Sequence, residues 1–234
     1  ASRETTIAGL AAAALHGAKW IDDDITVELI HPNTHPPRGI LTRRDVLRDG
    51  EVTAVAGMAV TTPERTAFDI GRREQRRAAV ARLDALAHAT GLKVDDVMCI
   101  AQRHPRARGL RTLETALGLV DPGAQSPRET YLRLLLIEAG LPRPQTQIPV
   151  IADDETYYLD MGWEDCMVAV EYDGEHHRTN TRQYRKDIRR LETLQRLGWI
   201  LIRVIAGDRP VAILRRVRHA LDARRSSVNS GFSV

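Results

Sequence analysis

The stretch from Ser126 to Ala223 constrains the fold most, because it alternates between helix-type and strand-type hydrophobic patterns. Ser126, Pro127 and Glu129 form a capping box that starts a helix, and Gly140 ends it. The later elements are three extended segments, a long helix, a strand and a last helix, over 146–151, 156–162, 167–173, 179–197, 199–204 and 210–223. This order predicts an α/β fold with a mixed sheet flanked by helices on both faces.

The residues before Asp121 predict a separate region of α+β type that is mainly helical. Ile25 to Ile30 and Thr53 to Val60 favour strands. Thr62 is the expected N-cap of a helix with Pro63 at its first position, and the pattern stays helical as far as Val120. We therefore predict an α+β and helical region over 1–122, an α/β domain over 123–225 and a flexible tail over 226–234.

Positive charge is concentrated in the last quarter of the chain. The whole sequence holds 34 Lys and Arg against 31 Asp and Glu, a net charge of +3. Residues 174–225 alone hold 14 Lys and Arg against 5 Asp and Glu. A polyanion is therefore the expected partner of this end of the chain.

Cysteine usage indicates a protein of the reducing cytoplasm, and hydropathy bears on membrane spans. The two cysteines, Cys99 and Cys166, cannot build a disulfide framework and stand in no zinc-type spacing. No run of the sequence approaches 18 apolar residues, so we expect no membrane span and no membrane partner.

Carboxylates gather on two neighbouring predicted strands. Within Met167–Asp173 the strand period of two puts Glu171 and Asp173 on one face. Asp160 lies on the preceding strand, and hairpin pairing would bring it beside Glu171. Three such acids repel one another unless a positive group lies between them, and hard divalent cations take carboxylate oxygens. We therefore predict a Mg²⁺ or Mn²⁺ site held by Asp160, Glu171 and Asp173.

Two histidines follow these acids directly. The chain continues from Asp173 with Gly174, Glu175, His176 and His177. An imidazole can ligate a metal or transfer protons near neutral pH. A single acid on a strand is more often a solvated residue, and a single His is more often a loop residue. The grouping of acids and imidazoles is what favours a site.

The order of these motifs resembles that of a known family. The motifs are Glu171-Tyr172-Asp173-Gly174, then His177, then Asp187 and Arg190 on a helix, then Leu197-Gly198-Trp199 leading into Ile202-Arg203-Val204. Over about residues 124–224 this arrangement is similar to the very-short-patch-repair-like endonuclease domains of the PD-(D/E)XK nuclease superfamily.

The resemblance implies a PD-(D/E)XK-like mixed sheet flanked by helices and a divalent-metal-dependent phosphodiester hydrolase. In that superfamily a helix Glu, a strand Asp and an E-x-K strand pair hold cations that activate water. By position, the implied catalytic residues are Glu129 as the helix acid, Asp160, Glu171, Asp173 and His177. The basic residues implied to bind DNA phosphates are Arg178, Arg182, Arg185, Lys186, Arg189 and Arg190.

The sequence departs from the superfamily pattern where Asp173 replaces the Lys. This branch of the superfamily commonly has Asp there, so the departure does not exclude activity, but another group must supply the positive charge. His177 and Lys186 are candidates for that group. Arg182, Arg185, Arg189 or the metal could stabilise the phosphorane.

The first region carries a second resemblance. The stretches Ala12-Ala13-Ala14-Leu15-His16-Gly17-Ala18 and Val60-Thr61-Thr62-Pro63-Glu64-Arg65-Thr66-Ala67-Phe68-Asp69 are similar to the C-terminal part of AbiEi-type antitoxin or transcriptional-regulator domains. In that family a winged helix usually precedes these residues, and this sequence does not include one. A capped helix with an ion pair between Arg65 and Asp69 accounts for the second stretch equally well.

Together these observations predict a Mg- or Mn-dependent DNA endonuclease or nickase of repair or defence, with a protein partner expected at the N-terminal region. One alternative is a DNA-binding antitoxin-like regulator whose nuclease-like domain is a catalytically silent docking module. Another is a protein-interaction scaffold. An enzyme requires the acids and His177 to converge, a docking module does not, and a scaffold would show little salt-dependent affinity for DNA.

Overall fold

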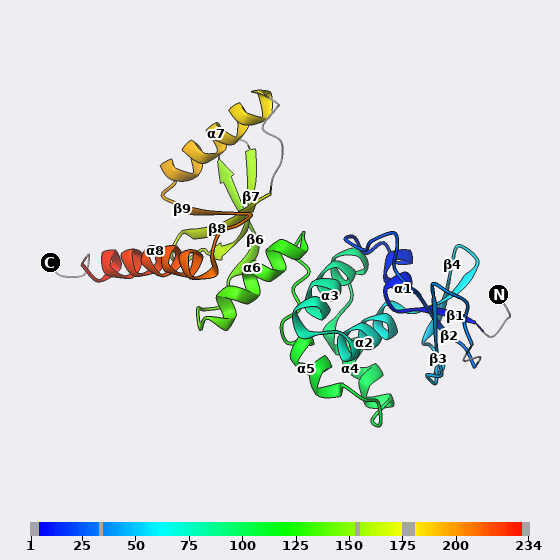
Figure 1. The fold of residues 1–234 in the computed structure, drawn as a ribbon. Coiled ribbons are helices and arrows are strands. Elements are labelled where there is room, and N and C mark those ends of the chain that lie inside the picture. Colours follow the sequence, from blue (N-terminus) through cyan, green and yellow to red (C-terminus); the bar gives the residue numbers. More distant parts are fainter. Residues whose placement is uncertain (1–4, 33–34, 153–154, 175–180, 231–234) are drawn as a thin grey trace. The chain divides into compact units, whose positions relative to one another are not determined.

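The computed structural model describes residues 5–32, 35–152, 155–174 and 181–230, with the side chains of 181–184 and 227–230 left aside. The chain divides into two compact units, Ala1–Thr130 and Tyr131–Val234, which we call unit 1 and unit 2. Each unit has its own mixed sheet, so the chain is a mixed α/β protein (Figure 1). No helix of the described segments has the length and apolar character needed to cross a bilayer.

Unit 1 combines a small five-stranded sheet with a group of helices. The strands are β1 (Thr6–Ala8), β2 (Val27–Ile30), β3 (Ile40–Arg43), β4 (Val52–Val55) and β5 (Met58–Thr61), in the spatial order β3-β2-β1-β5-β4. The helices are α1 (Gly9–Leu15), α2 (Pro63–Arg73), α3 (Arg76–Thr90), α4 (Val94–Arg103) and α5 (Leu110–Leu117). Helix α2 packs against the other four helices and forms the centre of the unit (Figure 1).

Helix α2 begins as the sequence predicts. The hydroxyl of Thr62 accepts a hydrogen bond from the Arg65 backbone N–H at 3.3 Å, and Pro63 occupies the first helical position. A proline is tolerated there because the first N–H groups of a helix have no partner within it. The N-cap assigned to Thr62 is therefore confirmed.

The segment 53–60, predicted as one strand, is instead an antiparallel hairpin of β4 and β5. The chain reverses at Ala56 and Gly57, whose φ angles are 49° and 78°. Two consecutive positive φ values produce the tight turn whose twist matches that of paired strands. Alanine rarely adopts a positive φ, so Ala56 does not indicate a turn in the sequence.

Unit 2 has the order of elements that the sequence predicts. Its elements are α6 (Pro127–Glu138, which begins in unit 1), β6 (Gln145–Ala152), β7 (Glu155–Trp163), β8 (Val168–Asp173), α7 (Thr181–Arg196), β9 (Ile200–Ile205) and α8 (Pro210–Ser230). The sheet order is β6-β7-β8-β9. The first three strands are antiparallel, whereas β9 lies parallel to β8 after the crossover through α7.

Two hydrophobic clusters hold the helices of unit 2 against its sheet. The larger cluster joins Val170 and Ile202 of the sheet to Leu136 of α6 and Val217 of α8. In the other, Leu194 of α7 packs with sheet residues that include Ala169. Because Ala169 and Val170 are consecutive strand residues, their side chains point to opposite faces. The sheet therefore has α6 and α8 on one face and α7 on the other (Figure 1).

Candidate functional site

The two central strands of unit 2 separate at the predicted acidic site. Strand β7 pairs with β8 from Met161 opposite Val170 to Trp163 opposite Val168. Asp160 and Glu171 occupy the next position on each strand. There the side chain of Asp160, rather than its main chain, bonds the neighbouring strand. Oδ2 of Asp160 accepts a hydrogen bond from the backbone N–H of Tyr172 at 2.9 Å. The sequence thus placed Asp160 and Glu171 correctly at neighbouring strand positions.

The carboxylate of Glu171 is paired with a guanidinium from α7. Arg190 Nη1 donates to Oε2 of Glu171 at 3.0 Å, and Arg190 Nη2 donates to Oε1. Nη2 also donates to the backbone carbonyl of Tyr158 at 3.0 Å. Glu171 is a buried residue at 8% exposure. A bidentate pair of hydrogen bonds between an arginine and a carboxylate is among the strongest contacts that a carboxylate makes with a side chain.

Arg190 lies within the electrostatic reach of three acids. Burial of its guanidinium works to lower its pKa, but the hydrogen bonds to Glu171 and the charges of Glu171, Asp160 and Asp187 outweigh burial and raise the pKa. The sequence predicts a positive group among the acids, with a metal ion in that place. In the structure the guanidinium of Arg190 lies there.

The described residues do not fit a divalent cation as they are arranged. Both oxygens of Glu171 accept from Arg190, and one oxygen of Asp160 accepts from the Tyr172 backbone. Asp173 is partly buried at the end of β8. Within the described segments, no three His, Cys, Asp or Glu side chains come together in a group that could hold a metal ion. A cation at Glu171 would have to share the carboxylate oxygens with Arg190 or displace its guanidinium.

Glu129, expected as the helix acid of the site, caps the helix on which it lies. Its Oε1 accepts from the Ser126 hydroxyl at 2.9 Å, and its Oε2 accepts from the Gln125 backbone N–H at 2.9 Å. The Ser126 hydroxyl in turn accepts from the Glu129 N–H at 3.2 Å. This is the reciprocal cap that the sequence predicts, and it engages both oxygens of the carboxylate.

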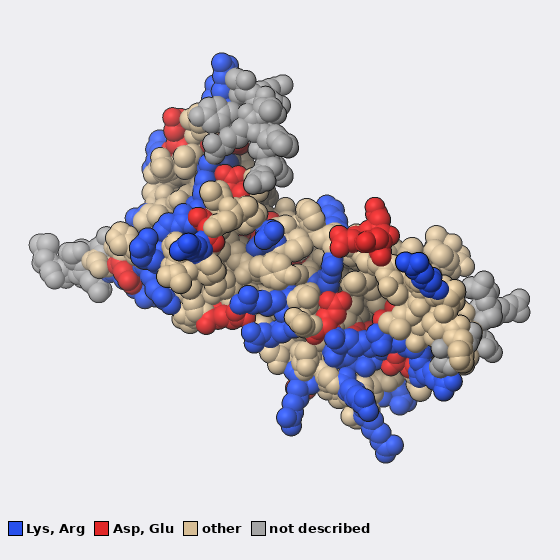
Figure 2. Space-filling model, viewed as in Figure 1, with Lys and Arg blue, Asp and Glu red and all other residues tan. Residues whose placement is uncertain are grey.

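Part of the predicted site falls outside the described residues. His177 and Arg178 lie in the segment 175–180, and the side chain of Arg182 is likewise outside the description. Arg185, Lys186 and Arg189 are exposed on α7, on the side away from buried Leu194. Figure 2 shows Lys and Arg side chains along α7 and over α8. The outer side of α7 is therefore a basic surface of unit 2.

Unit 1 contains a buried charged cluster that the sequence revealed only in part. The guanidinium of Arg65, at 1% exposure, pairs with Asp69 at 2.9 Å, which confirms the predicted ion pair. It also pairs with Glu51, at 0% exposure, and donates to the Val46 carbonyl at 2.8 Å. His104 Nε2 lies 2.9 Å from the other oxygen of Glu51. Glu51 and His104 are far from Arg65 in sequence, and no local spacing could have indicated them.

This cluster keeps Glu51 ionised. Burial works to raise the pKa of Glu51, but hydrogen bonds from His104, from the Arg48 backbone and from Arg65 outweigh burial and lower it. Burial likewise opposes the charge of Arg65, yet Asp69 and Glu51 raise its pKa. The arrangement ties the loop before β4, helix α2 and the end of α4 together. Its groups are paired and enclosed, which indicates a structural role.

Next to this cluster, an arginine-rich loop joins α4 to α5. It carries the exposed residues Arg106 and Arg108, and exposed Arg111 follows in the first turn of α5. The loop is held by Gly109, whose φ is +84° and where a Cβ would come within 2.1 Å of the Arg72 carbonyl oxygen. Only glycine fits such a close approach in this conformation. Unit 1 thus presents a second basic surface at a fixed position on its helices.

Comparisons with known proteins find a family match within unit 1. Residues 7–119 match the family model of the AbiEi antitoxin C-terminal domain. Over 220 residues the chain is 26% identical to two uncharacterised proteins of Mycobacterium tuberculosis, one from strain CDC 1551 / Oshkosh and one from strain H37Rv. The matches cover 92% of this chain and 80% of each relative. No solved structure matches the chain.

Proposed function

We propose that this protein is a DNA-binding regulator of the antitoxin kind, in which unit 2 is a nuclease-like docking module. The observation that carries the proposal is the match of residues 7–119 to an antitoxin domain, which takes in all the strands and helices α1 to α5 of unit 1. An antitoxin acts by binding, so its function depends on surfaces. Both units offer such surfaces.

The arrangement at Glu171 supports a binding role for unit 2. A hydrolytic metal site needs carboxylate oxygens that are open to an ion. The oxygens of Glu171 are instead engaged by Arg190, and Asp160 bonds the backbone of the neighbouring strand. The acidic motif then serves to fix α7 on the sheet. In this role it holds the basic face of that helix in position.

The proposed DNA surface is the outer face of α7 with Arg185, Lys186 and Arg189. These side chains are exposed, and the inward side of the same helix is anchored by Leu194 and Arg190. A rigid helix with clustered cations binds phosphates through release of counterions, which makes the affinity salt-dependent. A second proposed DNA surface lies on unit 1, where Arg106 and Arg108 of the loop and Arg111 at the start of α5 would contact a phosphate backbone.

The test is a DNA-binding and cleavage experiment on the full chain. Binding to a duplex is measured at several salt concentrations, and plasmid, single-stranded and mismatched duplex DNA are incubated with Mg²⁺ or Mn²⁺ and with chelator. We expect salt-dependent binding and no chelator-sensitive cleavage. Absence of DNA binding at low salt would overturn the proposal.

A second candidate function is metal-dependent DNA cleavage or nicking. The observation that favours it is the separation of β7 from β8 at Asp160 and Glu171, which places two acids at an opening in the sheet. In this reading the Asp160→Asn and Glu171→Gln variants would lose cleavage by a factor of thousands or more, because a lost activated water costs several kcal/mol. They would still bind DNA. Cleavage that depends on both acids would therefore replace the regulator proposal by this one.

A further inference from the structure

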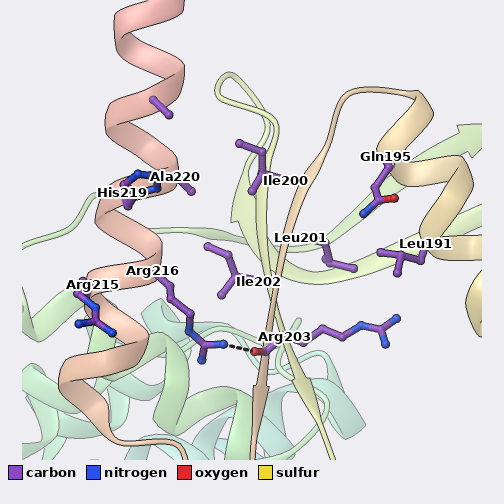
Figure 3. A pocket seen from close by; sticks show the side chains of 11 residues that line it. Leu191, Gln195, Ile200, Leu201, Ile202, Arg203, Arg215, Arg216, His219 and Ala220 are labelled. Atoms are coloured by element: carbon purple, nitrogen blue, oxygen red, sulfur yellow. Dashed lines mark hydrogen bonds between the residues drawn. The ribbon is translucent and has the colours of Figure 1, made fainter.

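A groove runs along the outer edge of the sheet in unit 2. It has a volume of about 780 Å³ and lies between the facing sides of α7 and α8, with β9 as its floor (Figure 3). Helix α7 contributes Leu191 and Gln195, and α8 contributes Arg215, Arg216 and His219. Figure 3 shows Leu201 and Arg203 directed toward α7, and Ile200 and Ile202 directed toward α8.

The floor of the groove is a strand edge with main-chain groups directed outward. Strand β9 is last in the order β6-β7-β8-β9. In a parallel pair, alternate residues direct both their N–H and C=O toward the neighbouring strand. Ile200 does so, since its N–H donates to the Met167 carbonyl of the β8 side at 2.8 Å. Leu201 and Arg203 therefore direct theirs away from the sheet and into the groove.

Among the described residues, side chains cover this edge at the C-terminal end of β9, near Arg203 and Ile205. Arg216 Nη1 donates to the Arg203 carbonyl at 3.0 Å, and Asp208 accepts from the Ile205 N–H at 3.3 Å. The Arg216 guanidinium also pairs with Asp208 at 2.6 Å. Covering an edge with charged side chains is a usual protection against unwanted strand pairing. The part around Leu201, between the two helices, lies beyond these two contacts.

The groove combines apolar surface with positive charge. Ile200, Leu201 and Ile202 form the floor, and Ala220 and Ala223 of α8 extend its apolar surface. Arg215 supplies positive charge on the α8 side and Arg203 on the α7 side, while Arg216 is paired with Asp208, and none of the residues that line the groove is an Asp or a Glu. An occupant that complements this lining combines apolar and acidic side chains.

We propose that this groove binds an extended acidic segment of a partner protein, which adds to the sheet as a strand beside β9. The proposal rests on the docking role proposed for unit 2 and names the surface that performs it. The main chain of the segment would bond Leu201, an acidic side chain would face Arg215, and the alternate apolar side chains would pack on Leu191. Affinity from main-chain bonds with selectivity from alternate side chains is typical of strand addition.

The lining favours this occupant over two others. A nucleic acid offers no ladder of alternating N–H and C=O groups, and its phosphates would gain nothing from the apolar floor. A second copy of the chain would bring the arginines of both grooves together, and like charges across paired strands are destabilising.

The experiment uses the full chain and a fluorescein-labelled peptide of eight residues in which glutamate and valine alternate. Fluorescence anisotropy should show binding that Arg215→Glu weakens by about tenfold or more, with circular dichroism to check that the variant is folded. Arg225→Glu is the matched control, because it makes the same charge change on an exposed position of α8 outside the groove. A peptide in which lysine replaces glutamate should not bind.

Two further peptides test strand addition without altering the protein. In each, every second backbone nitrogen is methylated, in one of the two alternate registers. A strand presents only one set of N–H groups to its neighbour, so one register should abolish binding and the other should leave it intact. Equal behaviour of the two registers, equal binding of the lysine peptide, or no binding of the glutamate peptide would overturn the proposal.

Two control measurements separate this proposal from its competitors. If a short single-stranded DNA binds with a dependence on Arg215 while the peptide does not, the groove is a nucleic-acid site. Concentration-dependent dimers that Arg215→Glu alters would assign it to a second copy. Peptide binding by a chain that binds no duplex DNA would reject the DNA-binding part of the proposed function and leave the docking surface standing.

Discussion

The guanidinium of Arg190 on α7 engages both oxygens of the Glu171 carboxylate on β8. Its third hydrogen bond goes to the Tyr158 carbonyl on β7, so one side chain joins the crossover helix to two strands. The contact lies where those strands separate and where the main-chain ladder no longer joins them. We infer that Arg190 holds this end of the sheet together.

Loss of either partner should destabilise the protein. The side chains of Arg190 and Glu171 are 23% and 11% exposed, so removing one leaves the other poorly solvated. We expect Arg190→Ala to lower the free energy of unfolding by about 2 to 3 kcal/mol, below the 3 to 5 kcal/mol typical of a fully buried pair. Urea unfolding measures the change.

A double-mutant cycle provides the control for this pair. Arg190→Gln combined with Glu171→Gln should cost less than the sum of the two single changes, because no uncompensated charge remains. Additive effects would mean that the contact contributes nothing of its own.

A divalent cation should partly replace the missing guanidinium. In the Arg190→Ala variant the charges of Glu171, Asp160 and Asp187 lose their counter-charge, so their affinity for Mn²⁺ should rise. At about 100 times its Kd, the ion would stabilise this variant by about 2.7 kcal/mol. Thermal unfolding with and without Mn²⁺ measures the effect, and Arg190→Lys, which keeps a cation, is the control. Equal stabilisation of the wild-type protein would instead favour the nuclease reading.

The buried cluster of unit 1 should make stability fall in acid. Because the pKa of Glu51 is lowered in the folded state, its contribution is present above the unfolded pKa and is lost as pH falls through the folded value. The ordinary Glu pKa of about 4.3 sets the upper limit of that window. Unfolding free energies measured from pH 7 to pH 3 should decline more steeply in the wild type than in Glu51→Gln. That variant should also lose about 1 to 3 kcal/mol at pH 7, because the buried Arg65 loses one of its two carboxylate partners and keeps only Asp69.

Gly109 should tolerate no side chain. A Cβ there would come within 2.1 Å of the Arg72 carbonyl oxygen, in addition to the strain of φ +84°. Gly91 is the matched control: its φ is +70°, and no atom lies within 4 Å of a Cβ placed on it. We expect Gly91→Ala to cost about 1 to 2 kcal/mol from backbone strain alone and Gly109→Ala to cost clearly more. Similar melting temperatures for the two variants would show that the loop can shift away from α2.

Neutralising α7 should flatten the salt dependence of DNA binding. If Arg185, Lys186 and Arg189 each contact a phosphate, their replacement by Gln lowers the slope of log K against log salt by about 0.9 for each contact. The matched control replaces Arg106, Arg108 and Arg111 in unit 1. A slope that changes only in this control would place the DNA surface on unit 1.

The sequence was most informative where periodic patterns are long and end at strong stop signals. In unit 2 the helices α6 and α7 end near Gly140 and Gly198, and every strand lies within one or two residues of its prediction. Unit 1 was harder because its strands have three or four residues, too few to show a period. The hairpin turn at Ala56 was missed because a non-glycine residue with positive φ leaves no signature in the sequence.

The sequence predicts which residues of the candidate site are neighbours on paired strands, but it does not predict which side chains of other elements contact them. Strand period and hairpin order were enough to place Asp160 next to Glu171. The partner of Glu171 could not be predicted, since the register of α7 on the sheet depends on how Leu194 packs. The sequence therefore predicts a phosphate contact for Arg190 as for its neighbours, whereas in the structure its guanidinium bonds the sheet. The catalytic roles of His177 and the acids stay predictions.

The parallel pairing of β9 with β8 has a consequence for how the protein is made. All strands of unit 1 and helices α1 to α5 lie within the first 117 residues, so that unit can fold while the rest is still being synthesised. Unit 2 cannot complete its sheet until β9 leaves the ribosome, because its last strand returns only after the long crossover through α7. For that interval the outer edge of β8, with Glu171 on it, faces the surroundings of the nascent chain. The second unit therefore completes its sheet only late in synthesis, and until then it leaves a strand edge open to pairing with other chains.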